Sequence, residues 1–205
     1  YTSQYTLSLH DALPIWRPAE DRLPKLLPGI NLVHGLAGER EETYEHNERF
    51  LRRLLEEDLL VRRVNIRQVM AFPGTEMSGT GAQIANEHKK RFKRYKRQIR
   101  EEIDNPMLQR LAPPGTVLPD VHLEYHRDGK TFGRQLGTYP ILVALPGERD
   151  LGTTVDAAIV DYGYRSVTAV PYPLDLNSAT MAELTAIPGL GKKRAGDIVV
   201  NRPHD

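Results

Sequence analysis

The chain contains 205 residues, with 28 Lys and Arg against 27 Asp and Glu and a formal net charge of +1 at pH 7. A surface for a polyanion must therefore come from local clustering of cations, not from overall charge. No apolar run is long enough to span a membrane and no secretory signal is recognisable, so we expect no membrane partner and a cytoplasmic location. The absence of cysteine excludes disulfides, zinc thiolates and cysteine-ligated clusters within this polypeptide. The seven histidines show no metal-ligand spacing, so no metal site is expected.

Residues 1–15 (YTSQYTLSLHDALPI) show neither a helical period nor sustained alternation. They resemble the translation of a sequencing adapter, so we interpret them as a non-native leader and expect the natural sequence to begin near Trp16 or Arg17. An ordinary leader is the alternative. In either case they are set aside from the fold.

Residues 16–112 begin with a strand–helix–strand pattern. Residues 30–36 (INLVHGL) form a short apolar run typical of a buried strand, and residues 43–60 place apolar side chains at helical spacing. A second strand is predicted over residues 61–72, before Pro73-Gly74. Short loops between these elements favour an α/β fold with a parallel βαβ unit.

A second helix is predicted over residues 85–103, ending at Asn105-Pro106. One stripe of this helix is apolar, and the remaining surface is densely basic. We regard the basic surface as a secondary candidate for nucleic-acid binding, with a solvated surface helix as the alternative. Its members are Lys89, Lys90, Lys93, Arg94, Lys96 and Arg97.

Residues 113–173 form a β-rich region that starts at Pro113-Pro114-Gly115. The sequence Asp128-Gly129 is a hairpin signal. Five short strands with turn residues between them predict a small β-barrel of the OB kind. The predicted strands cover residues 117–125, 131–136, 139–145, 155–161 and 166–170.

The last region, residues 174–205, contains two short predicted helices around the sequence IPGLGKKR. We expect Asn177 or Ser178 to cap the first helix, with Glu183 too far along the chain to complete a capping box. Met181, Leu184 and Ile187 are expected to form its buried edge.

The turn between these two helices has the chemistry of a phosphate site. Glycines at positions 189 and 191 permit unusual backbone angles and let a phosphate approach the main chain closely. Main-chain amides at the start of the second helix then point at the anion, and Leu190 fills the groove between the helices. Such contacts bind phosphate without reading bases. The predicted binding residues are Gly189, Leu190, Gly191, Lys192, Lys193 and Arg194.

The hydrophobic–Gly–hydrophobic–Gly pattern is similar to the turn of helix-hairpin-helix elements, and the likeness covers residues 176–203. It implies a nucleic-acid backbone, of DNA or RNA, as the partner. A hairpin used for packing or for protein contact is the alternative.

The N-terminal half carries a second resemblance. The GLAGE loop at residues 35–39 and the FPGT sequence at residues 72–75 resemble features of radical S-adenosylmethionine enzymes and of their methylthiotransferase branch. Residues 116–170, with Gly133-Arg134, are similar to the RNA-binding TRAM barrel of that branch. The order of the modules resembles a mostly archaeal family of radical S-adenosylmethionine proteins.

This resemblance implies that residues 16–112 form part of a radical S-adenosylmethionine TIM-like barrel. Residues at the carboxyl ends of such barrel strands point toward the site. The implied cofactor- or substrate-facing residues are His34, Glu39, Arg67 and Gln68. The ordinary alternatives are a satisfied buried histidine, a helix-start acid and a structural ion-pair partner.

Enzymes of this superfamily use three cysteines, usually CxxxCxxC, to hold a 4Fe–4S cluster that cleaves S-adenosylmethionine. Because this chain has no cysteine, the resemblance implies an inert C-terminal fragment of a longer enzyme that modifies a nucleic acid. Two other functions stay open, a non-catalytic DNA- or RNA-binding module and a protein-interaction scaffold.

Overall fold

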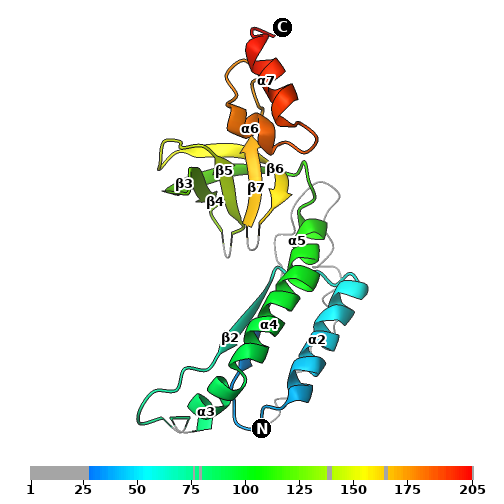
Figure 1. The fold of residues 1–205 in the computed structure, drawn as a ribbon, viewed down its shortest axis with the longest axis vertical. Coiled ribbons are helices and arrows are strands. Elements are labelled where there is room, and N and C mark those ends of the chain that lie inside the picture. The colour runs from blue at the N-terminus through cyan, green and yellow to red at the C-terminus, as the bar shows by residue number, and fades with distance from the viewer. Residues whose placement is uncertain (1–27, 76, 79, 138–139, 164–165, 205) are drawn as a thin grey trace. The chain divides into compact units, whose positions relative to one another are not determined.

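The structure is a computed structural model that describes residues 28–75, 77–78, 80–137, 140–163 and 166–204. The proposed leader, residues 1–15, lies outside these ranges. The chain divides into two units, Tyr1–Leu111 (unit 1) and Ala112–Asp205 (unit 2), which are described separately (Figure 1). No helix in the described ranges combines the length and the apolar character needed to cross a membrane.

Unit 1 contains a two-stranded parallel sheet whose strands are connected by a helix. The strands pair in register from Gly29 opposite Arg63 to His34 opposite Gln68. The described elements are β1 (Gly29–His34), α2 (Glu41–Glu56), β2 (Arg63–Gln68), α3 (Thr80–Glu87), α4 (Lys89–Ile99), the π-helical η1 (Arg100–Asp104) and α5 (Asn105–Leu111).

The core of unit 1 lies between the sheet and helices α2 and α4, which run beside each other in Figure 1. Leu51 from α2, Val64 from β2 and Ile99 from α4 are fully buried there, and Ile103 and Met107 extend the same cluster. Burial of apolar surface by all of these elements holds the unit together.

The predicted partial TIM-like barrel is wrong. In the described part of unit 1 the parallel sheet has two strands, and helices α2 and α4 pack with it into one core. The strand–helix–strand pattern did indicate the parallel pairing of β1 and β2. Short-range periodicity reports which faces are buried, but the number of strands in a sheet depends on distant pairings that a local pattern does not contain.

The predicted end of the second helix at Asn105-Pro106 is also wrong. The helical path continues from α4 through η1 into α5, with Pro106 as the second residue of α5. Proline lacks an N–H and clashes with a preceding carbonyl in a regular α-helix, and a π-helical turn is one arrangement that relieves this conflict. The buried side chains of Ile103 and Met107 favour continuation because they extend the core.

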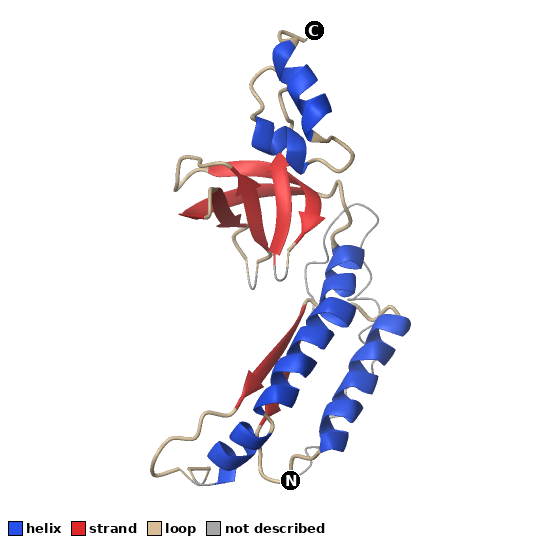
Figure 2. Ribbon diagram, in the orientation of Figure 1, coloured by secondary structure: helices blue, strands red, loops and turns tan. Residues whose placement is uncertain are grey.

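Unit 2 begins with the small β-barrel that the sequence predicts, and Figure 2 shows its strands in red. The closed strand order is β3-β4-β5-β7-β6, with β5 and β7 parallel and the other pairs antiparallel, as in an OB-like fold. Asp128 and Gly129 connect β3 to β4 with positive φ angles, which confirms the hairpin signal. The strands are β3 (Val117–Arg127), β4 (Lys130–Arg134), β5 (Leu142–Pro146), β6 (Thr154–Tyr162) and β7 (Ser166–Pro171).

Two short helices follow the barrel in unit 2, α6 (Met181–Ala186) and α7 (Lys192–Val200). A buried carboxylate, Glu183, connects them to the barrel. Its Oε2 accepts hydrogen bonds from the Thr180 amide (2.7 Å) and hydroxyl (2.9 Å), and its Oε1 pairs with the Arg149 guanidinium. Arg149 is itself held by Thr131 of β4, whose hydroxyl oxygen accepts the Arg149 amide hydrogen (2.9 Å).

The predicted cap of α6 is therefore corrected. Thr180, not Asn177 or Ser178, is the N-cap, and Glu183 completes a capping box with it. Asn177 and Ser178 instead bond to Asp175 in the turn before the helix. Both earlier positions have side chains suited to capping, so residue type alone did not identify the first helical turn.

Gly133 in β4 provides a test of barrel packing. A Cβ at this position would overlap the His122 carbonyl oxygen and lie 3.0 Å from Val121 Cγ1. We expect Gly133→Ala to destabilise unit 2 by about 2 kcal/mol because β3 must move to admit the methyl group. Urea unfolding followed by circular dichroism measures the change. The exposed Gly137, where a Cβ meets no described atom within 4 Å, supplies the control Gly137→Ala. Equal stability of the two variants would contradict the close approach.

Candidate nucleic-acid interface

The turn between α6 and α7 places a helix N-terminus in solvent. The first hydrogen bond of α7 runs from the Ala195 amide to the Gly191 carbonyl (3.0 Å). Within the described residues the amides of Lys192, Lys193 and Arg194 therefore have no main-chain acceptor, and no side chain caps the helix. Three N–H groups at the positive end of a helix form a binding site for an anion.

The two glycines of the turn have different roles. Gly189 has a φ of 82°, in the left-handed region that favours glycine. Gly191, at the N-cap, has a φ of −71°, which any residue adopts, so the expectation of an unusual backbone angle there is wrong. A Cβ on Gly191 would meet no described atom within 4 Å. Neither the backbone angles nor the packing of the described residues requires glycine at position 191. The absence of a side chain on Gly191 leaves open space in front of the amides at the start of α7.

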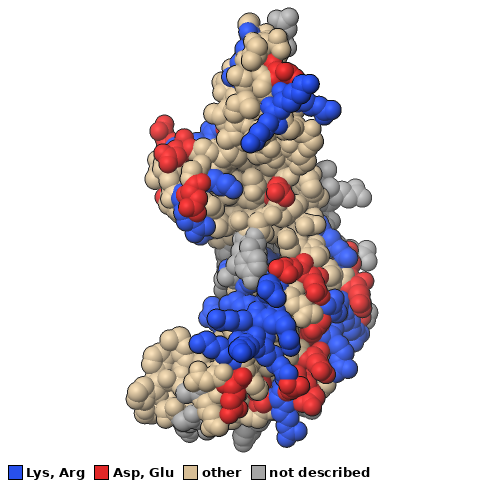
Figure 3. Space-filling model, in the orientation of Figure 1, with Lys and Arg blue, Asp and Glu red and all other residues tan. Residues whose placement is uncertain are grey.

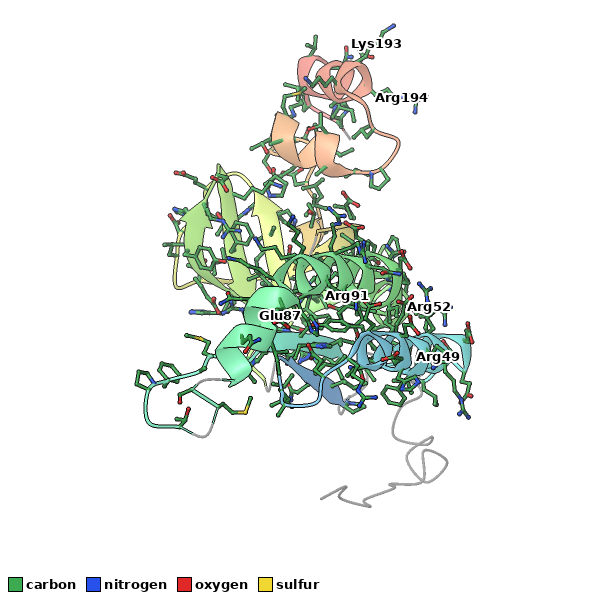
Figure 4. The ribbon with its side chains drawn as sticks, turned by 60° about the horizontal axis from the view of Figure 1, so that its bottom comes forward. Arg49, Arg52, Glu87, Arg91, Lys193 and Arg194 are labelled. Carbon is green, nitrogen blue, oxygen red and sulfur yellow. The ribbon has the colours of Figure 1, made fainter. Side chains whose placement is uncertain are left out.

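Cationic side chains surround the open amides. Lys192, Lys193 and Arg194 are all exposed, and none forms an ion pair with a described residue. Arg194 donates a hydrogen bond to the Gly189 carbonyl (3.2 Å), which ties its side chain to the turn. Figure 4 shows Lys193 and Arg194 extending away from the hairpin. The site therefore combines main-chain donors with exposed positive charges, as contacts to a phosphate require.

A small apolar cluster holds the two helices at the angle that exposes this turn. Ala179, Leu184 and Ala195 are buried, and Leu190 from the turn packs against them, as the sequence predicts. Met181 was expected on the buried edge but is 41% exposed, since the capping box places it in the first turn on the solvent side. Ile187 is half-buried and ends the helix.

The sequence-predicted residues of unit 1 form a different arrangement, centred on the Glu39 carboxylate. Glu39 Oε2 accepts from His34 Nδ1–H (2.9 Å) and from the Gly35 amide (2.9 Å). Glu39 Oε1 accepts from the Tyr44 hydroxyl (2.9 Å) and from His88 Nδ1–H (2.8 Å). The His34 ring is completely buried and stacks on Tyr44, with the ring centroids 4.3 Å apart.

This network fixes the charge of its members. Burial alone would raise the pKa of Glu39, but hydrogen bonds from His88, the Gly35 amide and Tyr44 together hold it below its ordinary value of 4.5. Burial also lowers the pKa of His34 below 6.5, despite the neighbouring Glu39 carboxylate. Both carboxylate oxygens are occupied by internal donors, so Glu39 holds the GLAGE loop against α2 and α4 and does not present a free carboxylate.

The remaining two candidates do not join this network. Gln68 lies beside His34 across the sheet, but its side-chain amide donates to the Ala85 carbonyl (2.8 Å). Arg67 points to the opposite face of β2 and is exposed. Sequence reasoning missed Tyr44 and His88, which fall within the two predicted helices over residues 43–60 and 85–103. A signal was available, because both side chains carry a polar group that needs a partner when buried.

No family model matches the chain. The chain is 46% identical over 187 residues to an uncharacterized protein of Archaeoglobus fulgidus, covering 91% of this chain and 34% of that protein. It is 46% identical over 151 residues to an uncharacterized protein of Methanocaldococcus jannaschii, covering 73% of this chain and 28% of that protein. The chain thus spans about a third of the length of the curated relatives it matches.

The Glu39 network predicts acid sensitivity of unit 1. Because the folded-state pKa of Glu39 is lowered, its carboxylate stabilises the fold above pH 4.5 and this contribution is lost as the pH falls through the folded-state pKa. His34, whose pKa is also lowered, adds a loss that begins below pH 6.5. We expect Glu39→Gln to cost about 2 kcal/mol at neutral pH and to flatten the dependence on pH below 4.5.

Urea unfolding followed by circular dichroism over this pH range measures both effects. The control is Glu42→Gln, which removes an exposed carboxylate from the first turn of α2, three residues after Glu39. We expect this control to change the free energy of unfolding by only a few tenths of a kcal/mol. If Glu39→Gln followed the control at every pH, the network would not hold unit 1 together.

Proposed function

We propose that the α6–α7 hairpin binds the phosphate backbone of a nucleic acid without reading its sequence. The observation that carries this proposal is the open N-terminus of α7, where three amides without internal acceptors lie behind a glycine whose missing side chain no internal contact explains. A phosphate oxygen accepts hydrogen bonds from such amides, and the adjacent cations neutralise its charge. We place this activity in the cytoplasm.

The surroundings of the turn favour phosphate over a protein partner. The side chains next to the open amides, Lys192, Lys193 and Arg194, are charged and exposed, whereas Leu190 turns inward against the apolar cluster. Protein interfaces usually centre on apolar or aromatic side chains, with charged residues depleted from that centre. Contacts to phosphate leave the bases unread, so the proposal covers DNA and RNA alike.

Gly191→Val tests the proposal. Valine at this position fits the observed backbone angles, and its side chain would occupy the space in front of the amides. We expect affinity for a duplex DNA or a structured RNA to fall about tenfold or more, with a shallower dependence of log affinity on log salt. Fluorescence anisotropy across a salt series, with the whole 205-residue chain, measures both quantities.

The matched control is Gly196→Ala, a glycine inside α7 where a Cβ also meets no described atom within 4 Å. It should raise stability by up to about 1 kcal/mol, because alanine is the better helix former, and leave binding unchanged. Equal binding by the wild type, Gly191→Val and Gly196→Ala would remove the hairpin from the proposed interface. It would favour the hairpin as a packing element or protein contact.

For the longer relatives we propose radical S-adenosylmethionine chemistry on the bound nucleic acid. This proposal rests on the resemblance carried by the GLAGE and FPGT sequences and not on the presence of a TIM-like barrel. The residues present here do not fit the cluster, since the chain has no cysteine, and Glu39 and His34 are engaged with each other. Any cluster ligands must belong to the part of the relatives that this chain does not cover. Iron analysis of the whole Archaeoglobus protein tests the idea. A protein without CxxxCxxC and without bound iron would leave the non-catalytic binding module and the protein-interaction scaffold as the two functions.

A further inference from the structure

One face of α4 carries cations that the fold itself does not use. We call it the basic arc, formed by Lys89, Lys90, Lys93, Arg94 and Arg97. At 3.6 residues per turn these five positions fall within about 140° of the helix circumference. All five side chains are exposed, and none forms an ion pair with a described residue. Figure 3 shows Lys and Arg side chains gathered over α4.

The other faces of α4 account for its packing. Phe92, Tyr95 and Ile99 lie on the side opposite the basic arc and are buried in the core of unit 1. The side next to α2 is also satisfied, because Arg91 pairs with Glu41 and Gln98 bonds to Glu48 (3.0 Å). The cations that hold α4 in place are therefore distinct from those of the basic arc.

The basic arc works against the stability of its own helix. Lys89 and Lys93, Lys90 and Arg94, and Lys93 and Arg97 are like charges four residues apart, a spacing that destabilises a helix. The first turn of α4 contains no acid, although acids are the residues that suit the positive end of the helix dipole. Residues 89–100 hold eight of the 28 Lys and Arg of the chain and none of its 27 Asp and Glu. Such a departure from the rules of helix stability is expected at functional surfaces.

We propose that the basic arc is a second surface for nucleic-acid phosphates, separate from the hairpin. It spans eight residue steps, or about 12 Å of helix, and a duplex presents a charge every 1.7 Å or so along its axis, so several phosphates face the arc at once. The inference that the bound polyanion is a nucleic acid rests on the function proposed for the hairpin. The inference that α4 carries a binding surface rests on the exposed cations of the basic arc.

Two other occupants fit the arc less well. An anionic membrane is bound more firmly where apolar side chains on the same face insert beside the charges, and the apolar residues of α4 are buried on the opposite side. A protein partner would be expected to use apolar or aromatic contacts, and the arc contains only Lys and Arg. Phosphates need charge alone, and the arc supplies only charge.

Lys90→Gln/Lys93→Gln tests the proposal in the 205-residue chain. The two changes remove two positive charges and all three of the like-charge pairs spaced four residues apart. We expect affinity for duplex DNA or RNA to fall roughly tenfold or more at moderate salt, and the slope of log affinity against log salt to become shallower by about 2. The thermal midpoint should stay constant or rise, because the repulsion within α4 is relieved. A purely structural role would lower it.

Arg49→Gln/Arg53→Gln is the matched control. It removes two positive charges from α2, the neighbouring helix, where both side chains are exposed and Figure 4 labels Arg49. Arg53 pairs with Glu57 at the surface, a contact of small energetic effect. We expect the control to retain the wild-type salt slope. If both double variants bound duplex with the wild-type slope, or both reduced it equally, the basic arc would not be a specific surface.

The hairpin and the arc are separated by testing Gly191→Val beside these variants. Loss of binding in Lys90→Gln/Lys93→Gln with full binding in Gly191→Val would support the arc and contradict the function proposed for the hairpin. Full binding in Lys90→Gln/Lys93→Gln with loss of binding in Gly191→Val would support the hairpin and contradict the basic arc as a binding surface. Competition by poly-glutamate as effective as competition by duplex, at equal charge concentration, would overturn nucleic acid as the occupant in favour of an acidic protein.

Discussion

The arrangement of unit 2 depends on one buried carboxylate, that of Glu183. It accepts two hydrogen bonds from Thr180 and pairs with Arg149, so it starts helix α6 and attaches that helix to the barrel. Burial would raise its pKa, but the donors from Thr180 and Arg149 hold the pKa below its ordinary value. A buried carboxylate is stable only where hydrogen-bond donors and a cation contact it. This requirement fixes which side of the α6–α7 hairpin faces the barrel and which faces solvent.

Unit 1 uses the same principle in a different place. Glu39 accepts hydrogen bonds from His34 at the end of β1, from the Gly35 amide in the following loop, from Tyr44 of α2, and from His88, the N-cap of α4 and the one donor distant in the sequence. In each unit a single acid gathers donors across elements. The exposed cations at the α7 turn and in the basic arc lie outside these two networks.

The sequence predicted well the features that depend on neighbouring residues. The Asp128-Gly129 turn, the inward position of Leu190 and the parallel pairing around α2 all follow from local residue type and spacing. It failed where distant contacts decide the outcome. The partial TIM-like barrel required strands whose pairing no local pattern specifies. The helix continues past Pro106 because apolar residues beyond the proline are buried in the core of unit 1. For the site, the glycine pattern indicated open main-chain amides at the start of α7, and their binding of phosphate stays a prediction. Tyr44 and His88 were missed because a helical stripe has the same spacing whether or not its polar atoms have partners.

The separation of charge along the chain has a kinetic consequence. With a net charge of only +1, the molecule feels little overall attraction to a polyanion at long range, yet eight Lys and Arg without any acid occupy residues 89–100. A local cluster of like charge exerts a torque on the molecule as it approaches a polyanion and does not merely draw it closer. Beyond about 10 Å at 0.1 M salt this torque is screened, so orientation is selected only in the last steps of an encounter. Added salt should therefore slow productive association more than it speeds release.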